Sequence, residues 1–201
     1  GLALIGRATG HAEWVLLGIC GGLLHVWNHA IFKSLLFFGA GSVIHSMGTR
    51  ELDVMGGLGR RMPATATCFL IGAVAICGLP PLNGFVSELM IYLGLFKTIH
   101  AEPPSIVSAA AFAAPGLALV GALAVACFVK VYGIVFLGAP RGEKAAHAHE
   151  SGFAMTAPMF VLAACCVVIG VAPLLFAGLL GQAAATWAVA ESAKAADISN
   201  M

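Results

Sequence analysis

Long apolar runs separated by short polar stretches dominate the chain. The run Trp14–Ile44 is 31 residues long, and Lys33 is its only Asp, Glu, Lys or Arg residue. Leu117–Leu137 holds one charged residue in 21, and Met159–Leu180 holds none in 22. A helix of about 20 apolar residues crosses the hydrocarbon core of a bilayer. The pattern therefore predicts an all-α, multi-pass membrane protein.

Polar links divide these runs into separate helices. Ser46–Met62 ends the first run, and Pro63 suits the first turn of the next helix, where its missing N–H costs nothing. A polar loop at Ala139–Ser151 precedes the last run. The expected helices are Trp14–His45, Pro63–Gly78, Phe85–Phe96, Leu117–Leu137 and Pro158–Leu180, the last with a kink at Pro173.

The segment that contains Pro80, Pro81 and Gly84 cannot continue an α-helix. The two prolines lack backbone donors, and the glycine gives the chain conformational freedom. With a brief apolar helix on either side, this segment predicts a discontinuous, proline-broken membrane helix. Such a break is tolerated only where the irregular backbone faces protein or a wet cavity. Lys97–Ser105 is a second break, and Pro115 is expected to separate a short Ala-rich piece from the next helix.

Composition strengthens the membrane interpretation. Hydrophobic residues make up 60% of the chain and charged residues 9%, whereas soluble domains carry about 25% charged residues. Mean hydropathy is +0.98, and a net charge of +1 gives no basis for nucleic-acid binding. We expect a transmembrane domain over residues 1–180 and a tail over 181–201. Residues 1–6 have the character of the end of an earlier apolar helix, so a preceding part of the same polypeptide is expected.

Of the Asp, Glu, Lys and Arg residues, three fall inside apolar helices, namely Lys33, Glu88 and Lys130. A charge at membrane depth costs at least about 2–3 kcal/mol, so such residues mark functional sites unless they reach the interface from a helix end. His25, His29 and Lys33 recur every four residues, which places them along one helical stripe. Imidazoles titrate near neutrality, so the stripe is a candidate proton relay. In the alternative interpretation, the histidines only hydrogen-bond to backbone or neighbouring helices.

Glu88 lies four residues after Gly84. A break exposes unpaired backbone groups that can hold water or ions, so a carboxylate beside it can exchange protons with a wet path. The alternative is an ion pair with Lys130, or with a loop arginine, that only supports assembly. Lys130 itself lies near a helix end, from which a lysine can extend to the membrane surface. The run His147–Glu150 lies in a polar loop without further ligands, so no metal site is expected.

Around these residues the sequence resembles a known family. His25–Val43 is similar to the central lysine helix of the antiporter-like membrane subunits of respiratory complex I, multi-subunit Na⁺/H⁺ antiporters and energy-converting hydrogenases. Gly78–Glu88 resembles the broken-helix segment of that family, and Met55–Pro63 resembles the linker before it. The Leu-Pro-Pro-Leu-Asn-Gly-Phe form of the break, followed by Ser-Glu, is most similar to the hydrogenase-4 and formate hydrogenlyase branch. The resemblance extends over about residues 2–173.

The resemblance implies a fold of two inverted five-helix repeats, of which this chain would hold most of the second. It implies that Lys33 is the central protonatable lysine and that His25 and His29 link it to water. Glu88 would be the terminal proton-exchange group, and Lys130 a basic group on the following helix. In that family NAD, flavin, iron–sulfur and nickel sites belong to partner subunits. No catalytic residue, cofactor site or metal site is therefore expected in this chain.

The expected function is proton translocation, coupled to redox chemistry in partner subunits. The expected partners are other membrane subunits of a hydrogenase or complex I-like assembly, the missing N-terminal half of the same polypeptide and the lipid bilayer, but no nucleic acid. The expected location is the bacterial cytoplasmic membrane. Two alternatives stay open: an Mrp-type subunit that exchanges Na⁺ for H⁺, and a purely structural membrane anchor of a hydrogenase.

Overall fold

The computed structural model of the protein describes residues 1–100 and 104–186, with residues 100 and 104–111 described by their backbone alone. Over these residues the chain forms helices and no strand, which confirms the all-α expectation. Three helical segments are long and apolar enough to cross a membrane, namely Ala12–Met47, Phe112–Phe136 and Phe153–Val171. The chain is therefore a multi-pass membrane protein.

The central element is α2, Ala12–Met47, which agrees with the helix expected from Trp14 to His45. A short α1, Leu2–Thr9, precedes it and ends at a left-handed turn on Gly10, whose φ is 76°. α2 packs against α1, α3, α4 and α7. It therefore supplies the frame against which the rest of the bundle is placed.

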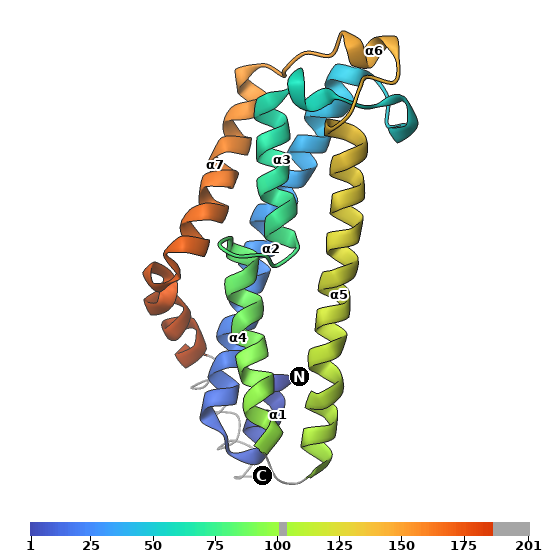
Figure 1. The fold of residues 1–201 in the computed structure, drawn as a ribbon. Helices are drawn as coiled ribbons and strands as arrows, with labels where there is room; N and C mark the ends of the chain where they lie inside the picture. Colours follow the sequence, from blue (N-terminus) through green and yellow to red (C-terminus); the bar gives the residue numbers. More distant parts are fainter. Residues whose placement is uncertain (101–103, 187–201) are drawn as a thin grey trace, which may run out of the picture.

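Two shorter helices, α3 (Pro63–Ile76) and α4 (Asn83–Lys97), lie end to end beside α2, as Figure 1 shows. Pro63 occupies the first turn of α3, as expected. The expected break between the two helices is confirmed. At about 1.5 Å per residue each piece is little more than 20 Å long, so neither piece alone spans a bilayer core of about 30 Å.

The glycine that provides unusual backbone freedom in the break is Gly78, with a φ of 63°. The expectation that Gly84 plays this part was wrong, because Gly84 lies inside the first turn of α4. Gly84 is needed for space instead. A Cβ atom at this position would collide with the carbonyl oxygen of Ala75, so the absence of a side chain lets α4 approach the end of α3.

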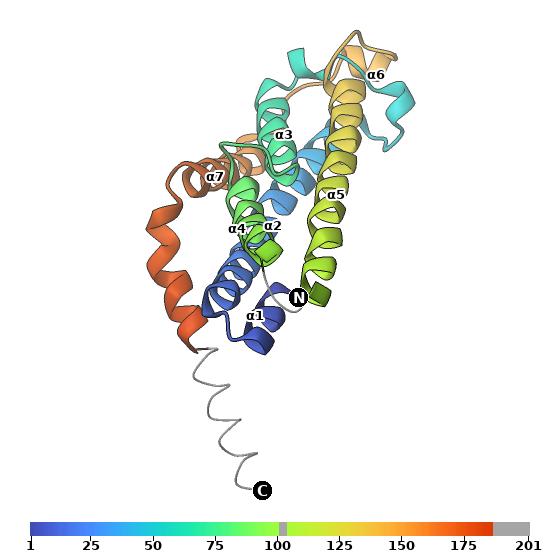
Figure 2. The same cartoon turned by 60° about the horizontal axis from the view of Figure 1, so that its bottom comes forward.

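The next helix, α5, runs from Pro104 to Phe136 and passes through Pro115. The expectation that Pro115 separates two pieces was therefore wrong. A proline inside a helix removes one backbone donor, and membrane helices tolerate this loss through local adjustment. The second break is also shorter than expected: a 3₁₀ turn at Thr98–His100 follows α4, and residues 101–103 lie outside the described residues. α5 lies beside α3 and α4 (Figures 1 and 2).

The C-terminal part starts earlier than expected. A single turn, α6 (Glu143–Ala146), lies in the loop, and α7 (Phe153–Val171) begins five residues before Pro158, which is inside the helix. The uncharged residues 153–157 extend the apolar segment backwards, and a proline in the second turn removes only one backbone bond. The interruption at Pro173 is confirmed, because a 3₁₀ turn replaces the α-helix there. Helical structure then continues to Thr186, beyond the boundary expected at residue 180, and residues 187–201 lie outside the described part.

Two apolar clusters hold these helices together. One cluster joins α2, α3 and α5 through Leu36, Val43, Phe69, Val135 and Phe136. The other joins α2, α3 and α7 through Phe32, Leu35, Cys68, Met159 and Cys166. Large apolar side chains also remain exposed on α2 and α5, as suits a chain surrounded by lipid or by other membrane subunits.

Candidate functional site

The expected stripe of His25, His29 and Lys33 lies on one uninterrupted helix, α2. His25 and Lys33 are half-buried, and His29 is exposed. The ring centroids of the two histidines are 6.3 Å apart, so the rings are too distant for a direct hydrogen bond. The Phe32 ring stands edge-on to both, at 6.4 Å from His25 and 5.4 Å from His29. A proton passing along the stripe would therefore need bridging water.

A buried polar network joins α2 to the start of α4. The Asn28 Nδ2 atom donates to the carbonyl oxygen of Asn83 at 2.8 Å, and Asn83 Nδ2 donates back to Asn28 Oδ1 at 3.2 Å. Asn28 Nδ2 also donates to the Ser87 hydroxyl oxygen at 3.3 Å. All three residues are 0% exposed. Buried amides that find partners in this way hold two helices in one register, since any other register would leave them unpaired.

This network reaches the stripe through His25. The Nδ1 atom of His25 lies 3.1 Å from the Ser87 hydroxyl oxygen, while the Ser87 hydroxyl donates to the Gly84 carbonyl oxygen at 3.0 Å. A serine hydroxyl has only one proton to donate. Because that proton is directed at Gly84, we assign His25 the tautomer that donates Nδ1–H to Ser87. The Nε2 atom of the neutral ring is then the atom that can accept a proton.

Three neighbouring elements enclose the break before α4. On the side of α2, the Asn28 side chain hydrogen-bonds to the Asn83 carbonyl oxygen at the end of the break. On the side of α3, Gly84 lies closely against the Ala75 carbonyl oxygen. From α7, Gly170 lies directly against the backbone of Pro81, where a Cβ atom would collide with the Pro81 carbonyl oxygen. On these sides the irregular backbone faces protein, which is the condition for such a break to be stable in a bilayer.

The structure places Glu88 beside the break. Its carboxylate packs against Gly78, at the left-handed turn after α3, where a Cβ atom would collide with it. Glu88 is half-buried and makes no hydrogen bond and no ion pair with any described residue. The alternative of an ion pair with Lys130 or a loop arginine is therefore not realised within the described chain. A carboxylate without a fixed partner can still bind and release a proton.

The two lysines lie away from these contacts. Lys130 is exposed on α5, six residues before its last residue, Phe136. Lys33 makes no hydrogen bond or ion pair with the described residues. Of the four predicted site residues outside α4, the one that is hydrogen-bonded to α4 in the described chain is thus His25.

A second polar network, which the sequence pattern did not predict, lies at the loop end of the bundle. Glu150 accepts hydrogen bonds from the backbone N–H groups of Ala64 and Thr65, at 2.8 and 3.3 Å, and from the Thr65 hydroxyl. Unpaired N–H groups and the helix dipole favour a carboxylate at this position, the N-terminus of α3. The Ser42 hydroxyl is hydrogen-bonded to two other hydroxyl groups, that of Thr65 at 2.8 Å and that of Ser151 at 2.7 Å. Glu150 is therefore a half-buried cap of α3 rather than a solvated loop residue.

The described residues offer side chains for proton transfer but no cluster for a metal ion. No group of three His, Cys, Asp or Glu residues there could hold one. The cavity between α3 and α5 is lined by apolar side chains, with Tyr132 the only one that carries a hydroxyl. The chemistry that this arrangement supports is exchange of protons between side chains and water.

Known proteins are similar to this chain in sequence and in fold. The family model described as NADH:quinone oxidoreductase/Mrp antiporter, TM, matches residues 1–114. Formate hydrogenlyase subunit 3 of Escherichia coli (strain K12) is 43% identical over 172 residues, which cover 86% of this chain and 28% of that protein. Hydrogenase-4 component B of the same organism is 44% identical over 169 residues, covering 84% of this chain and 25% of that protein. The chain thus spans about a quarter of the length of these curated relatives.

Among solved structures, the Mrp complex from Dietzia sp. DQ12-45-1b contains a similar chain. The TM-score is 0.70 at 21% sequence identity, and the match covers 86% of this chain and 39% of that one. At this identity the likeness concerns the fold. This chain therefore shares its overall fold with that chain of the Mrp complex.

Proposed function

The chain belongs to the NADH:quinone oxidoreductase/Mrp antiporter transmembrane family, and on that premise we propose that it conducts protons through a bacterial cytoplasmic membrane. In this proposal it works as part of a longer polypeptide within a membrane complex. Redox chemistry in partner subunits of a hydrogenase or complex I-like assembly drives the transfer. The names of two relatives, a formate hydrogenlyase subunit and a hydrogenase-4 component, support the hydrogenase assignment.

The observation that carries the proposal is the hydrogen bond between His25 and Ser87. It joins the stripe on α2 to the helix that carries Glu88, and Ser87 is the residue directly before Glu88. In our proposal Lys33 holds a proton near the middle of α2, and His29 passes it towards His25. The Nε2 atom of His25 accepts it, because Nδ1–H is already donated to Ser87.

Water completes the route at two places. The 6.3 Å separation of the His25 and His29 rings calls for a bridging water. Between His25 and Glu88 the broken backbone offers polar groups that can hold another. Glu88 then exchanges the proton with the far side of the break, which its lack of a fixed partner in the described chain allows. Lys130, exposed on α5, is proposed as a basic group that receives or hands over protons at a neighbouring subunit.

Replacement of Lys33 in the full-length protein, assembled in its complex and reconstituted into vesicles, tests the proposal. We expect Lys33→Ala to abolish proton uptake while the complex still assembles, because this side chain makes no hydrogen bond or ion pair with the described residues. Lys97→Ala is the matched control. It removes a lysine from an exposed ion pair with Glu13, outside the stripe, and should retain uptake. Unchanged uptake in the Lys33 variant would contradict the relay, and coupled movement of labelled Na⁺ would favour the antiporter alternative.

A further inference from the structure

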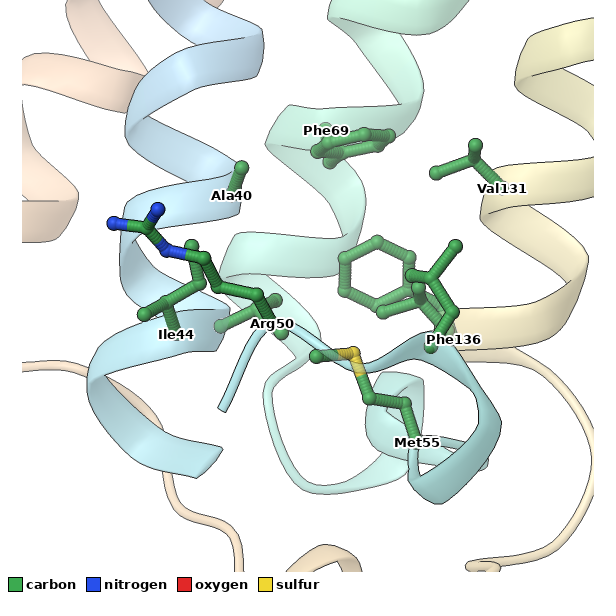
Figure 3. Close-up of a pocket in the computed structure, with 10 residues that line it drawn as sticks. Ala40, Ile44, Arg50, Met55, Phe69, Val131 and Phe136 are labelled. Atoms are coloured by element: carbon green, nitrogen blue, oxygen red, sulfur yellow. The ribbon is translucent and has the colours of Figure 1, made fainter. Parts of the chain in front are cut away.

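A cavity separate from the proton route lies between α2, α3 and α5. Its volume is about 210 Å³. Figure 3 shows the walls: Ala40 and Ile44 come from α2, Phe69 from α3, and Val131 and Phe136 from α5. The segment that follows α2 closes it with Met55 and Arg50. Arg50 is the only lining residue with a polar side chain.

The lining restricts what can occupy the cavity. Enclosed apolar cavities of about 150 Å³ stay dry and bind apolar molecules. This half-open cavity has walls of the same kind, so it suits an apolar guest from the surrounding bilayer. A helix from a partner subunit, about 10–12 Å across with its side chains, is too thick to enter. A single hydrocarbon chain is thin enough, and the bilayer supplies such chains at high concentration.

Arg50 adds a charge at the edge of this apolar space. It follows the last residue of α2, Met47, by three positions, which puts it at the end of a membrane-spanning helix. Its side chain is exposed and makes no ion pair with any described residue. In Figure 3 the guanidinium group points away from Phe69 and Phe136. The site therefore offers an apolar interior and an unpaired cation at the membrane surface.

We propose that this cavity binds one acyl chain of an anionic phospholipid whose phosphate group binds Arg50. Guanidinium and phosphate form two parallel charge-assisted hydrogen bonds, and basic pockets between transmembrane helices bind lipid headgroups. The bound lipid joins α5 to α2 and α3. α5 needs such a contact more than the other two candidate spans. Only 11% of its most apolar stretch of 18 residues is buried, against 28% of the corresponding stretch in each of the others.

The lipid site is tested on the full-length protein in its purified complex, stripped of lipid and incubated with phosphatidylglycerol. Native mass spectrometry then counts the lipids retained. Arg50→Gln removes the phosphate partner, and Val131→Trp fills the cavity from α5. Arg61→Gln removes an exposed cation that does not line the cavity, and Leu123→Trp introduces the same side chain at an exposed position of α5.

We expect both site variants to lower retention of one phosphatidylglycerol about tenfold, while both controls retain it. Phosphatidylcholine with the same chains should bind much less. Equal retention by Arg50→Gln and wild type, or equal binding of the zwitterionic lipid, would overturn the proposal. Displacement by inorganic phosphate would show an anion site without an acyl chain, and a wild-type complex without bound lipid would show that another subunit covers the cavity. Because Arg50→Gln alters an exposed side chain, its result stands even where Val131→Trp fails to fold.

Discussion

Removal of the Ser87 hydroxyl tests whether the buried network orients His25. Ser87→Ala deletes three hydrogen bonds, to His25 Nδ1 at 3.1 Å, to Asn28 Nδ2 at 3.3 Å and to the Gly84 carbonyl oxygen at 3.0 Å. At about 1 kcal/mol of net stability each, the upper limit is about 3 kcal/mol. Asn28 keeps its 2.8 Å bond to Asn83, and half-buried His25 can turn to water. We therefore expect a loss of about 1–2 kcal/mol in the free energy of unfolding.

The expected effect on transport is separate from this loss of stability. Without the Ser87 hydroxyl no protein group holds the Nδ1 atom of His25 in place, so the ring can turn to water and exchange tautomers. If loss of the oriented ring raises the free-energy barrier to proton transfer by the value of one hydrogen bond, about 1.4 kcal/mol, the rate of proton uptake falls about tenfold. The ¹⁵N chemical shifts of the His25 ring should also change, from a single Nδ1–H form to a mixture of the two tautomers.

Ser42→Ala provides the matched control for this experiment. Ser42 is as fully buried as Ser87 and loses hydrogen bonds to Thr65 and Ser151, but it contacts no histidine. It should cost similar stability and keep proton uptake near the wild-type rate. Uptake is measured with a pH-sensitive dye in vesicles and divided by the amount of assembled complex. Equal uptake by the Ser87 and Ser42 variants would refute the role assigned to the Ser87 hydroxyl.

Three further predictions concern the break and the cap of α3. Glu88→Gln should stop proton uptake and leave assembly intact, because no described cation loses a partner; failed assembly would instead reveal an ion pair with another subunit. Replacing Pro80 and Pro81 together with Ala should raise helix content by circular dichroism and lower uptake, since a continued helix closes the irregular backbone beside Glu88. Normal uptake in that variant would make the break a mere connector. Glu150→Ala should lower the stability by about 2–3 kcal/mol in thermal unfolding, because three donors at the start of α3 lose a charged acceptor. An unchanged melting temperature would show that water replaces the cap.

Hydropathy predicted most of the helices because lipid leaves the backbone no alternative partners. The same reasoning explains why some helix boundaries predicted from prolines were wrong. Pro115 and Pro158 were expected to bound helices and instead lie inside them, since each removes a single backbone bond from a segment that is otherwise apolar. The paired Pro80 and Pro81 do break the helix, and the left-handed Gly78 turns the chain there. A lone proline in a membrane segment is thus weaker evidence for a boundary than a proline pair beside glycine.

The candidate site was only half predictable. The stripe of ionisable residues on α2 and the position of Glu88 beside the break follow from spacing, but Asn28, Asn83 and Ser87 are neutral. Their contacts arise only when α2 packs on α4. Asn28 did carry a signal, because an amide inside an apolar run needs a partner. Glu150 carried none, since the Ala64 N–H that it caps lies 86 residues earlier in the chain.

The two polar networks together set the position of the broken helix along the membrane. Asn28 and Ser42 are 14 positions apart on α2, about 21 Å at 1.5 Å per residue, and α3 is 14 residues long. Ser42 binds Thr65 near the start of α3, and Asn28 binds Asn83, the first residue of α4 beyond the break. Between these anchors the helices contact each other through apolar side chains, which in lipid give little preference for one register over another. Both anchors pair specific buried groups, so a shift of one turn would unpair both. The depth of the break, and of the carboxylate beside it, is therefore set by neutral polar residues and not by the charges themselves.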